Sequence, residues 1–195
     1  MRGNKTREKI LDTSLLLFNE KKASNVSTVQ ISSEMKISPG NLYYYFANRE
    51  DVIRCIWRER MVEEIEELMK EQQMVLSVRQ FRDFMERCIK HGERYRFFYT
   101  ELPTLLTNDP GLEELCSTVG KESADVLEAM LDRWIDSGLM KPVERKIKRI
   151  IGNNCRAVLW NAIIQEDAAV DSMDQQAFRE STYDHLTAIV EPYLQ

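Results

Sequence analysis

The sequence has no hydrophobic run long enough to cross a membrane and no extended alternation of apolar and polar residues. A membrane-spanning helix needs about 20 consecutive apolar residues, and the basic N-terminal segment lacks the small-residue cleavage site of a signal peptide. Alternation with a period of two marks a half-buried strand. These absences exclude a membrane protein and a protein built on β-sheets.

Cysteine is also scarce and scattered. None of the four cysteines belongs to a C-x-x-C pair, which argues against a zinc site and against a disulfide framework. They are Cys55, Cys88, Cys116 and Cys155. We expect reduced, mostly buried thiols in a cytoplasmic protein, with a redox sensor as the alternative. The two histidines, His91 and His185, stand alone, and we expect them to be surface or hydrogen-bonded residues rather than ligands.

The patterns on which catalysis depends are missing too. The sequence shows no nucleophile–base pairing, no metal-ligand spacing and no Gly-rich phosphate loop. We therefore expect a protein that is not an enzyme and that uses neither a metal nor a cofactor.

Negative charge dominates overall but not at the N-terminus. The net charge is −5. Residues 1–49 hold eight Lys or Arg against four Asp or Glu, a net of +4, which leaves 19 against 28, a net of −9, for residues 50–195. A basic N-terminal quarter confines attraction for phosphates to one part of the chain. Chance scatter is the alternative, because +4 is modest.

What is present is helical periodicity along almost the whole chain. Apolar residues recur at the i, i+4, i+7 spacing of one buried helix face in about nine segments. The expected helices span 5–20, 27–35, 38–46, 48–72, 77–92, a segment that starts at 95 and contains Pro103, 109–137, 143–165 and 174–193. We therefore predict an all-α fold of about nine helices.

The second and third of these helices are short and closely spaced. Ser27 and Gln30 have the spacing of a capping box, and Ile31 lies on the inward face. After a turn, Ser38 is an N-cap candidate, with Pro39 at the first helical position, where its missing N–H costs nothing. Two such helices with narrow apolar stripes suit a helix-turn-helix whose second member enters a DNA major groove.

Leu42 and Phe46, four residues apart, give this second member its inward side. The residues left on the outside are Pro39, Gly40, Asn41, Tyr43, Tyr44 and Tyr45. We expect Tyr43 and Tyr44 to face outward and to contact phosphates and thymine methyl groups; the alternative is that these aromatic rings fill a small core.

The other outer residues have simpler interpretations. Gly40 permits close approach of the backbone to DNA, and Asn41 has the amide geometry that pairs with adenine; an ordinary helix surface is the alternative for both. Polar or basic groups near helix starts are expected to contact phosphates. These are Lys5, Arg7, Thr28, Ser38 and Arg49.

A long helix follows the helix-turn-helix. Asn48 is its N-cap candidate, with Asp51 at the reciprocal position. Its apolar pattern continues to about Gln72, and no Pro/Gly linker interrupts it. A continuous helix transmits displacement, which a flexible linker cannot, so this helix is the expected mechanical link between two domains.

The run ISPGNLYYYF from Ile37 to Phe46, followed by NRED from Asn48 to Asp51, resembles the signature of the tetracycline-repressor (TetR) family of bacterial regulators. The close match covers residues 5–58. Three positions depart from the usual pattern. Lys36 replaces a common turn Gly, where a left-handed conformation costs about 1 kcal/mol, so we expect a slightly different turn. Ala47 replaces a frequent basic residue and Tyr45 a frequent His.

The resemblance implies a helix-turn-helix DNA-binding domain, which we place at residues 1–48, and a helical effector-binding and dimerisation domain at 49–195. It further implies an effector pocket among the middle helices and a homodimer through the last two. Large apolar residues near the predicted Pro103 kink are pocket candidates, with plain core as the alternative. They are Phe97, Phe98, Tyr99, Trp134 and Trp160.

We therefore expect a transcriptional regulator, most often a repressor in this family, that binds a palindromic double-stranded DNA operator as a homodimer and is released by a small-molecule effector. The competing hypothesis is a helical module whose helix-turn-helix docks a protein, which the modest basic charge favours. The sequence identifies neither the effector, the operator, the regulated genes, nor the sign of regulation.

Overall fold

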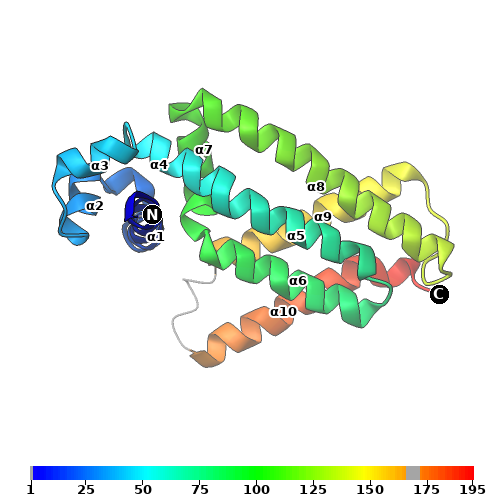
Figure 1. The fold of residues 1–195 in the computed structure, drawn as a ribbon. Helices are drawn as coiled ribbons and strands as arrows, with labels where there is room; N and C mark the ends of the chain where they lie inside the picture. Colours follow the sequence, from blue (N-terminus) through cyan, green and yellow to red (C-terminus); the bar gives the residue numbers. More distant parts are fainter. Residues whose placement is uncertain (1, 166–171) are drawn as a thin grey trace. The chain divides into compact units, whose positions relative to one another are not determined.

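The computed structural model describes residues 2–165 and 172–195, and helices dominate it (Figure 1). The α-helices are α1 (Arg2–Lys21), α2 (Thr28–Glu34), α3 (Pro39–Tyr45), α4 (Arg49–Ile56), α5 (Val62–Glu71), α6 (Val78–Arg94), α7 (Arg96–Asn108), α8 (Pro110–Asp136), α9 (Arg145–Gln165) and α10 (Ser172–Val190). Short 3-10 turns are η1 (Ala23–Asn25), η3 (Gln72–Met74) and η5 (Glu191–Tyr193), and η2 (Trp57–Met61) is a π-helical segment.

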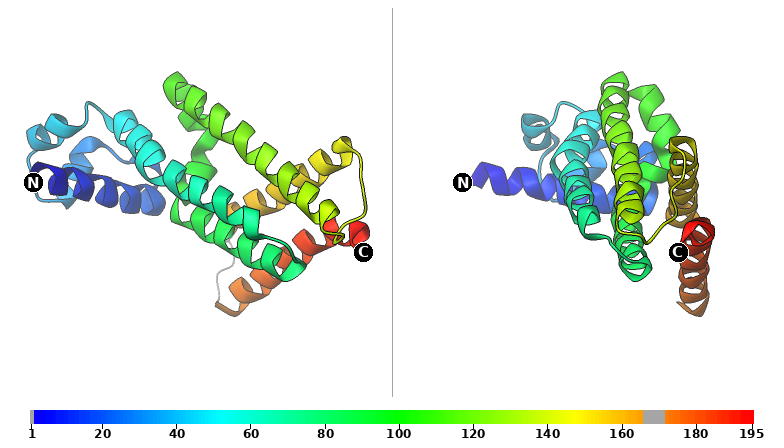
Figure 2. Two further views of the ribbon diagram at one scale, coloured as in Figure 1. Left: turned by 45° about the vertical axis from the view of Figure 1, so that its right-hand side comes forward. Right: turned by 90° about the vertical axis from the view of Figure 1, so that its right-hand side faces the viewer.

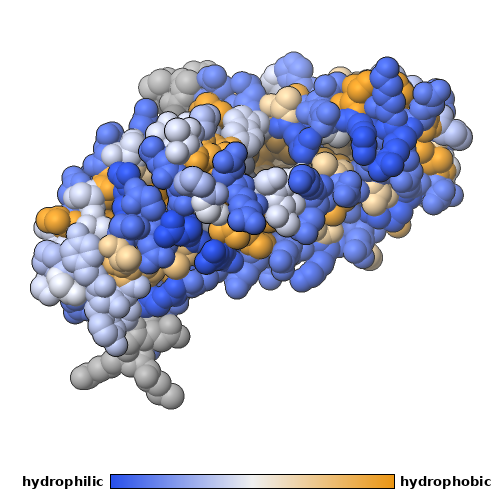
Figure 3. Space-filling view, turned by 90° about the horizontal axis from the view of Figure 1, so that it is seen from above, coloured by the Kyte–Doolittle hydropathy of each residue, from blue (hydrophilic) through white to orange (hydrophobic). Residues whose placement is uncertain are grey.

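The prediction of an all-α fold is confirmed. With α4, η2 and α5 counted as one run, the described residues form nine α-helical runs, and their one β-type feature is an isolated bridge between Met140 and Leu194. Within that part of the chain, no helix has both the length and the apolarity to span a bilayer. On the face drawn in Figure 3, hydrophilic residues predominate and hydrophobic ones are scattered among them.

The helices pack into two compact units. Unit 1 comprises Met1–Glu64 and Tyr95–Glu114, and unit 2 comprises Ile65–Arg94 and Leu115–Gln195. Helix α7 therefore belongs to the same unit as the helix-turn-helix, where it packs against α1 and η1. The division into functional domains at residues 48 and 49 concerns roles rather than packing, and it stays a prediction.

The core of unit 1 uses the inward faces expected from the sequence. Its fully or almost fully buried residues on α1 to α4, with their connections, include Ile10, Leu11, Phe18, Ile31, Leu42, Phe46, Val52, Ile53 and Ile56. Helix α7 adds two aromatic contacts: the ring centroids of Phe97 and Phe18 are 5.2 Å apart, and Phe98 stacks on Trp57 at 4.7 Å. Burial of these rings is what attaches α7 to α1 and η2.

The expected long helix forms, but its middle is not regular. Asn48 caps it by accepting a hydrogen bond from the Asp51 N–H at 2.8 Å, and the Asp51 carboxylate accepts one from the Ala47 N–H at 3.1 Å. The backbone then widens into the π-helical segment η2 before α5 begins. Such single-turn π segments occur often at functional sites, and periodicity alone gave no sign of this one.

Two arginine–carboxylate contacts tie η2 to α1. Arg7 donates from both terminal nitrogens to the two oxygens of Glu59, at 2.6 and 2.5 Å, and its guanidinium lies 5.2 Å from the centroid of the Phe46 ring. Arg60 of η2 pairs with Glu8 of α1. Arg7, which is expected to contact phosphates, is engaged with Glu59, and its contact with DNA stays a prediction.

This pair should make the stability of the protein depend on pH. The hydrogen bond from Arg7 holds the pKa of Glu59 below its ordinary value of 4.5. Because the folded pKa is depressed, the stabilisation is present above pH 4.5 and is lost as the pH falls through the folded pKa. We expect Glu59→Gln to lower the free energy of unfolding at pH 7 by about 0.5–1 kcal/mol, a small effect because water screens the pair.

The measurement is urea unfolding between pH 3 and pH 7, compared with Glu63→Gln. Glu63 is exposed on the same helical run and gives the same charge change. Wild type and Glu63→Gln should lose stability in parallel below pH 4.5, and Glu59→Gln should lose less. Equal slopes for all three proteins would show that the Arg7–Glu59 pair contributes nothing.

Unit 2 is organised around Trp134 of α8. Its side chain is fully buried, its Nε1 donates to the Val75 carbonyl at 2.8 Å, and its ring meets Phe81 edge-on at 5.5 Å. Helices α6, α9 and α10 lie side by side (Figure 2). Gly92 allows α6 and α9 to approach closely, because a Cβ there would lie 2.1 Å from the Ile163 Cδ1.

Candidate nucleic-acid interface

Local hydrogen bonds define the start of α2 and α3. The Ser27–Gln30 capping box is complete, with the Gln30 N–H donating to the Ser27 hydroxyl and the Ser27 N–H donating to the Gln30 side chain at 2.7 Å. Ser38 caps α3 by accepting from the Asn41 N–H at 3.2 Å, and Pro39 follows at the first helical position. Both caps are as predicted from the sequence.

The turn between the two helices keeps a left-handed residue although it lacks glycine. Lys36 has a φ of +56°. The Lys36 N–H donates to the Ser33 carbonyl and the Ile37 N–H to the Ser32 carbonyl, both at 3.0 Å. The lysine therefore takes the conformation in which a glycine would be less strained, and its side chain is exposed beside α3.

Helix α3 has the predicted inside and outside. Leu42 and Phe46 are buried, at 0% and 1% exposure, whereas Tyr43 is 51% and Tyr44 81% exposed. The Tyr43 hydroxyl lies 2.9 Å from the Thr28 hydroxyl, so the structure brings together two of the predicted contact residues, one from each helix. Tyr44 presents the larger free surface.

The remaining outer residues of α3 lie as expected for a surface. Tyr45 is half-buried and meets Tyr44 edge-on at 4.9 Å, and Pro39, Gly40 and Asn41 are exposed. A Cβ at Gly40 would have no heavy atom within 4 Å, so the fold of unit 1 does not demand glycine there. Open space at Gly40 leaves its backbone accessible to a partner.

Lys5 and Arg49, two of the three basic residues expected to contact phosphates, differ in their surroundings. Lys5 is exposed on α1. Arg49 is held at the start of α4, where it donates to the carbonyls of Ala23 and Ser24, each at 3.1 Å, and to the Glu50 carboxylate. The contact of either residue with DNA stays a prediction.

Two exposed residues next to these candidates were not predicted from the sequence as DNA contacts. Val29, beside Thr28 at the start of α2, is 55% exposed. Lys36 departs from the family pattern, yet it supplies a positive charge at the turn. The exposure of Val29 could have been predicted, because Val29 does not lie on the helix face that carries the buried Ile31.

The five aromatic residues predicted for an effector pocket are distributed over the two units. Phe97 and Phe98 are buried in unit 1, and Tyr99 contacts Phe98, with 6.2 Å between ring centroids. Trp134 is buried in unit 2, and Trp160 is 37% exposed on α9. The assignment of these residues to a pocket stays a prediction.

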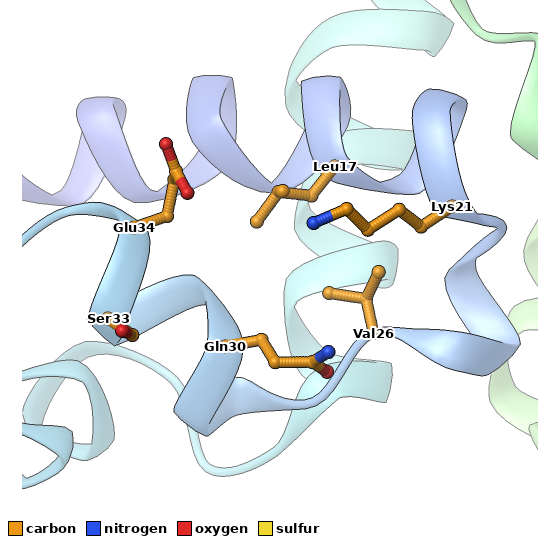
Figure 4. A pocket seen from close by; sticks show the side chains of 6 residues that line it. All are labelled: Leu17, Lys21, Val26, Gln30, Ser33 and Glu34. Atoms are coloured by element: carbon orange, nitrogen blue, oxygen red, sulfur yellow. The ribbon is translucent and has the colours of Figure 1, made fainter.

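Two surface hollows are lined by other residues. One, of about 200 Å³, lies between α1 and α2 (Figure 4), where Lys21 and Glu34 occupy opposite ends with Gln30 below. The second, of about 360 Å³, lies between α8 and α9 and is lined mainly by charged residues, including Lys121, Arg149 and Arg156. Neither contains any of the predicted DNA-contact or effector residues.

Three of the four cysteines, Cys55, Cys88 and Cys155, show no sign of activation. Burial raises the pKa of the Cys55 thiol, and it raises that of Cys88 and that of Cys155 to about 12. A reactive cysteine needs a lowered pKa, because the thiolate is the nucleophile. In the described residues, no group of three His, Cys, Asp or Glu side chains is placed to hold a metal ion.

Comparison with known proteins agrees with this geometry. Residues 10–55 match the family model of "Bacterial regulatory proteins, tetR family", and residues 60–195 match the TetR model described as "Bacterial transcriptional repressor". No curated protein sequence matches the chain.

Several solved structures share the fold. A TetR-family transcriptional regulator from Marinobacter aquaeolei VT8 is 27% identical, over 97% of this chain and 91% of that one, with a TM-score of 0.83. SmeT, the repressor of the Stenotrophomonas maltophilia multidrug efflux pump SmeDEF, is 18% identical over 97% and 90%, with a TM-score of 0.70. A SmeT–triclosan complex scores 0.69 at 18% identity, over 97% and 92%. At 18% identity, the similarity to SmeT shows only that the two proteins share a fold.

Both family models match in chain order, one over the helix-turn-helix and one over most of the remaining helices. The chain belongs to the TetR family of bacterial transcriptional regulators.

Proposed function

We propose that this protein is a cytoplasmic repressor that binds a palindromic operator as a homodimer and leaves it when a small-molecule effector binds. The observation that carries the proposal is the outer face of α3 in a TetR-family chain. There Tyr44 is 81% exposed, although large aromatic side chains are normally buried. An aromatic hydroxyl on a recognition helix suits both phosphate and thymine-methyl contacts.

A dimer is supported by an exposed face of α9. Ile150 is 43% and Ile164 36% exposed, and Ala157 between them is also exposed. At 3.6 residues per turn these positions fall on one stripe of the helix. Pairing such a stripe with its copy across a twofold axis would bury it. The last two helices, α9 and α10, remain the proposed interface.

Release by an effector is supported only by relatives. SmeT, which has this fold, was solved in complex with triclosan. We extend from this only that a small organic molecule is the class of effector to test. Its binding must favour a conformation with lower operator affinity, because a ligand with equal affinity for both conformations shifts nothing.

The proposed DNA contact of the outer face of α3 is tested by Tyr44→Ala. We expect the variant to bind the operator about 10-fold more weakly or worse, since one good base contact contributes about 1–3 kcal/mol. Tyr44→Phe separates the hydroxyl from the ring. The measurement is fluorescence anisotropy with an operator selected by the wild-type protein, together with circular dichroism to verify folding.

Leu16→Ala is the matched control, because Leu16 is 64% exposed in the same unit but lies on α1. It should bind the operator as wild type does. Unchanged operator affinity in a folded Tyr44→Ala protein would remove Tyr44 from the interface.

A further inference from the structure

The short turn η1 connects α1 to the helix-turn-helix. The chain reverses at Lys22, which has a φ of +67°, and η1 follows with Ala23 fully buried. Only two residues, Val26 and Ser27, separate η1 from α2. The backbone of η1 therefore sets where α2 begins. The first N–H groups of a helical turn have no partner within the turn, so something else must satisfy them.

Glu101 of α7 satisfies two of these groups. Its Oε1 accepts from the Ala23 N–H at 2.5 Å and its Oε2 from the Ser24 N–H at 3.0 Å. Glu101 is 8% exposed, and charge-assisted hydrogen bonds in such surroundings are stronger than those in water. One turn earlier on α7, the Phe97 N–H donates to the Asn19 side chain at 3.0 Å.

Arg49 of α4 holds the same turn from its other side. Its Nη1 donates to the carbonyls of Ala23 and Ser24, the two residues whose N–H groups bind Glu101. The Glu50 carboxylate orients the guanidinium through Nε and Nη2, at 3.1 and 2.8 Å. Ala23 and Ser24 thus have their N–H groups bound by a carboxylate of α7 and their carbonyls bound by a guanidinium of α4.

We propose that Glu101 is a positioning residue for the DNA-reading helices: with Arg49 it fixes η1, and through η1 it fixes α2 and α3 relative to α7. The proposal rests on the proposed DNA-binding function. Within unit 1 it connects α7 mechanically to the helix-turn-helix, because a displacement of α7 would move the two hydrogen bonds that hold the start of the helix-turn-helix.

The positioning role of Glu101 can be distinguished from a contribution to overall stability, because hydrophobic contacts also hold α7 in unit 1. The Phe97–Phe18 and Phe98–Trp57 contacts keep α7 in place without the carboxylate. In Glu101→Gln, the amide oxygen can accept from one N–H, but the amide nitrogen faces the other as a second donor. The turn should therefore loosen while the helices stay packed.

The test uses the full chain with Glu101→Gln. We expect the Ala23 and Ser24 amides to exchange with solvent about 10-fold faster or more, and operator affinity to fall about 5-fold or more. Glu113→Gln is the matched control, since Glu113 is exposed at the start of α8 and gives the same charge change. Glu101→Asp keeps the charge with a shorter side chain; it should give an intermediate loss and serves as the second variant if Glu101→Gln fails to fold.

The outcomes are distinct. A purely structural role would lower the thermal midpoint without changing affinity well below it, and that result would overturn the proposal. Unchanged exchange at Ala23 and Ser24 would do so as well. A wild-type protein that binds no selected DNA would overturn the proposed function itself, and with it the positioning role, whatever the exchange rates.

Discussion

Replacing Ile150 and Ile164 together by glutamate is expected to convert the proposed dimer into monomers and to weaken operator binding by about 100-fold or more. Both side chains are exposed on one stripe of α9. Carboxylates on that stripe would be buried without partners in a twofold interface, which is costly. A monomer presents one recognition helix, so the gain of about 10²–10⁴ from simultaneous engagement of two sites is lost.

The measurement is sedimentation velocity for the oligomeric state and anisotropy for operator affinity. Met74→Glu with Leu76→Glu is the matched control, because these residues are 72% and 50% exposed near the end of α5 and the change in net charge is the same. The control should remain a dimer. A dimer that survives both α9 substitutions would place the interface elsewhere, and a monomer with full affinity would refute the need for two recognition helices.

The largest effect on stability is expected from Trp134→Ala. Its side chain is fully buried and hydrogen-bonded to the Val75 carbonyl. Removing the indole leaves a cavity against Phe81 and an acceptor without its partner, which should lower the free energy of unfolding by about 3–5 kcal/mol. Urea unfolding at 25 °C is the measurement.

The same variant bears on the predicted effector pocket. A residue that lined an open pocket would cost little stability when truncated, because its site would already be partly empty. Met74→Ala, at a 72% exposed position near Val75, is the control and should change stability by less than about 0.5 kcal/mol. A loss below about 1 kcal/mol for Trp134→Ala would contradict its place in the core and favour the pocket assignment.

The sequence predicted the features of the fold that depend on residues close together in the chain, such as helix caps and buried helix faces. The Ser27–Gln30 and Asn48–Asp51 spacings gave the helix starts, because an N-cap and its partner lie three residues apart. The four-residue spacing of Leu42 and Phe46 gave the inward side of α3. The outward position of Tyr44 followed from these, since a helix has only one inward stripe.

Long-range partners could not be predicted in the same way. Periodicity states which face of a helix is buried but not which helix covers it. Glu101 and Ala23 are 78 residues apart, and Arg7 and Glu59 are 52 apart. Arg49 was assigned to phosphate because of its position at a helix start, whereas its hydrogen bonds within unit 1 depend on the path of η1. The same holds for the aromatic residues predicted to line a pocket, because the sequence did not show which helices pack against them.

The most direct test is to select DNA from a random pool with the wild-type protein and then titrate the selected site at several salt concentrations. We expect a palindrome whose half-sites are about one helical turn, roughly 10 base pairs, apart. Log affinity should fall linearly with log salt with a slope of about −5 to −9, the value for six to ten phosphate contacts. Failure to enrich any site, or an affinity independent of salt, would contradict a DNA-binding dimer.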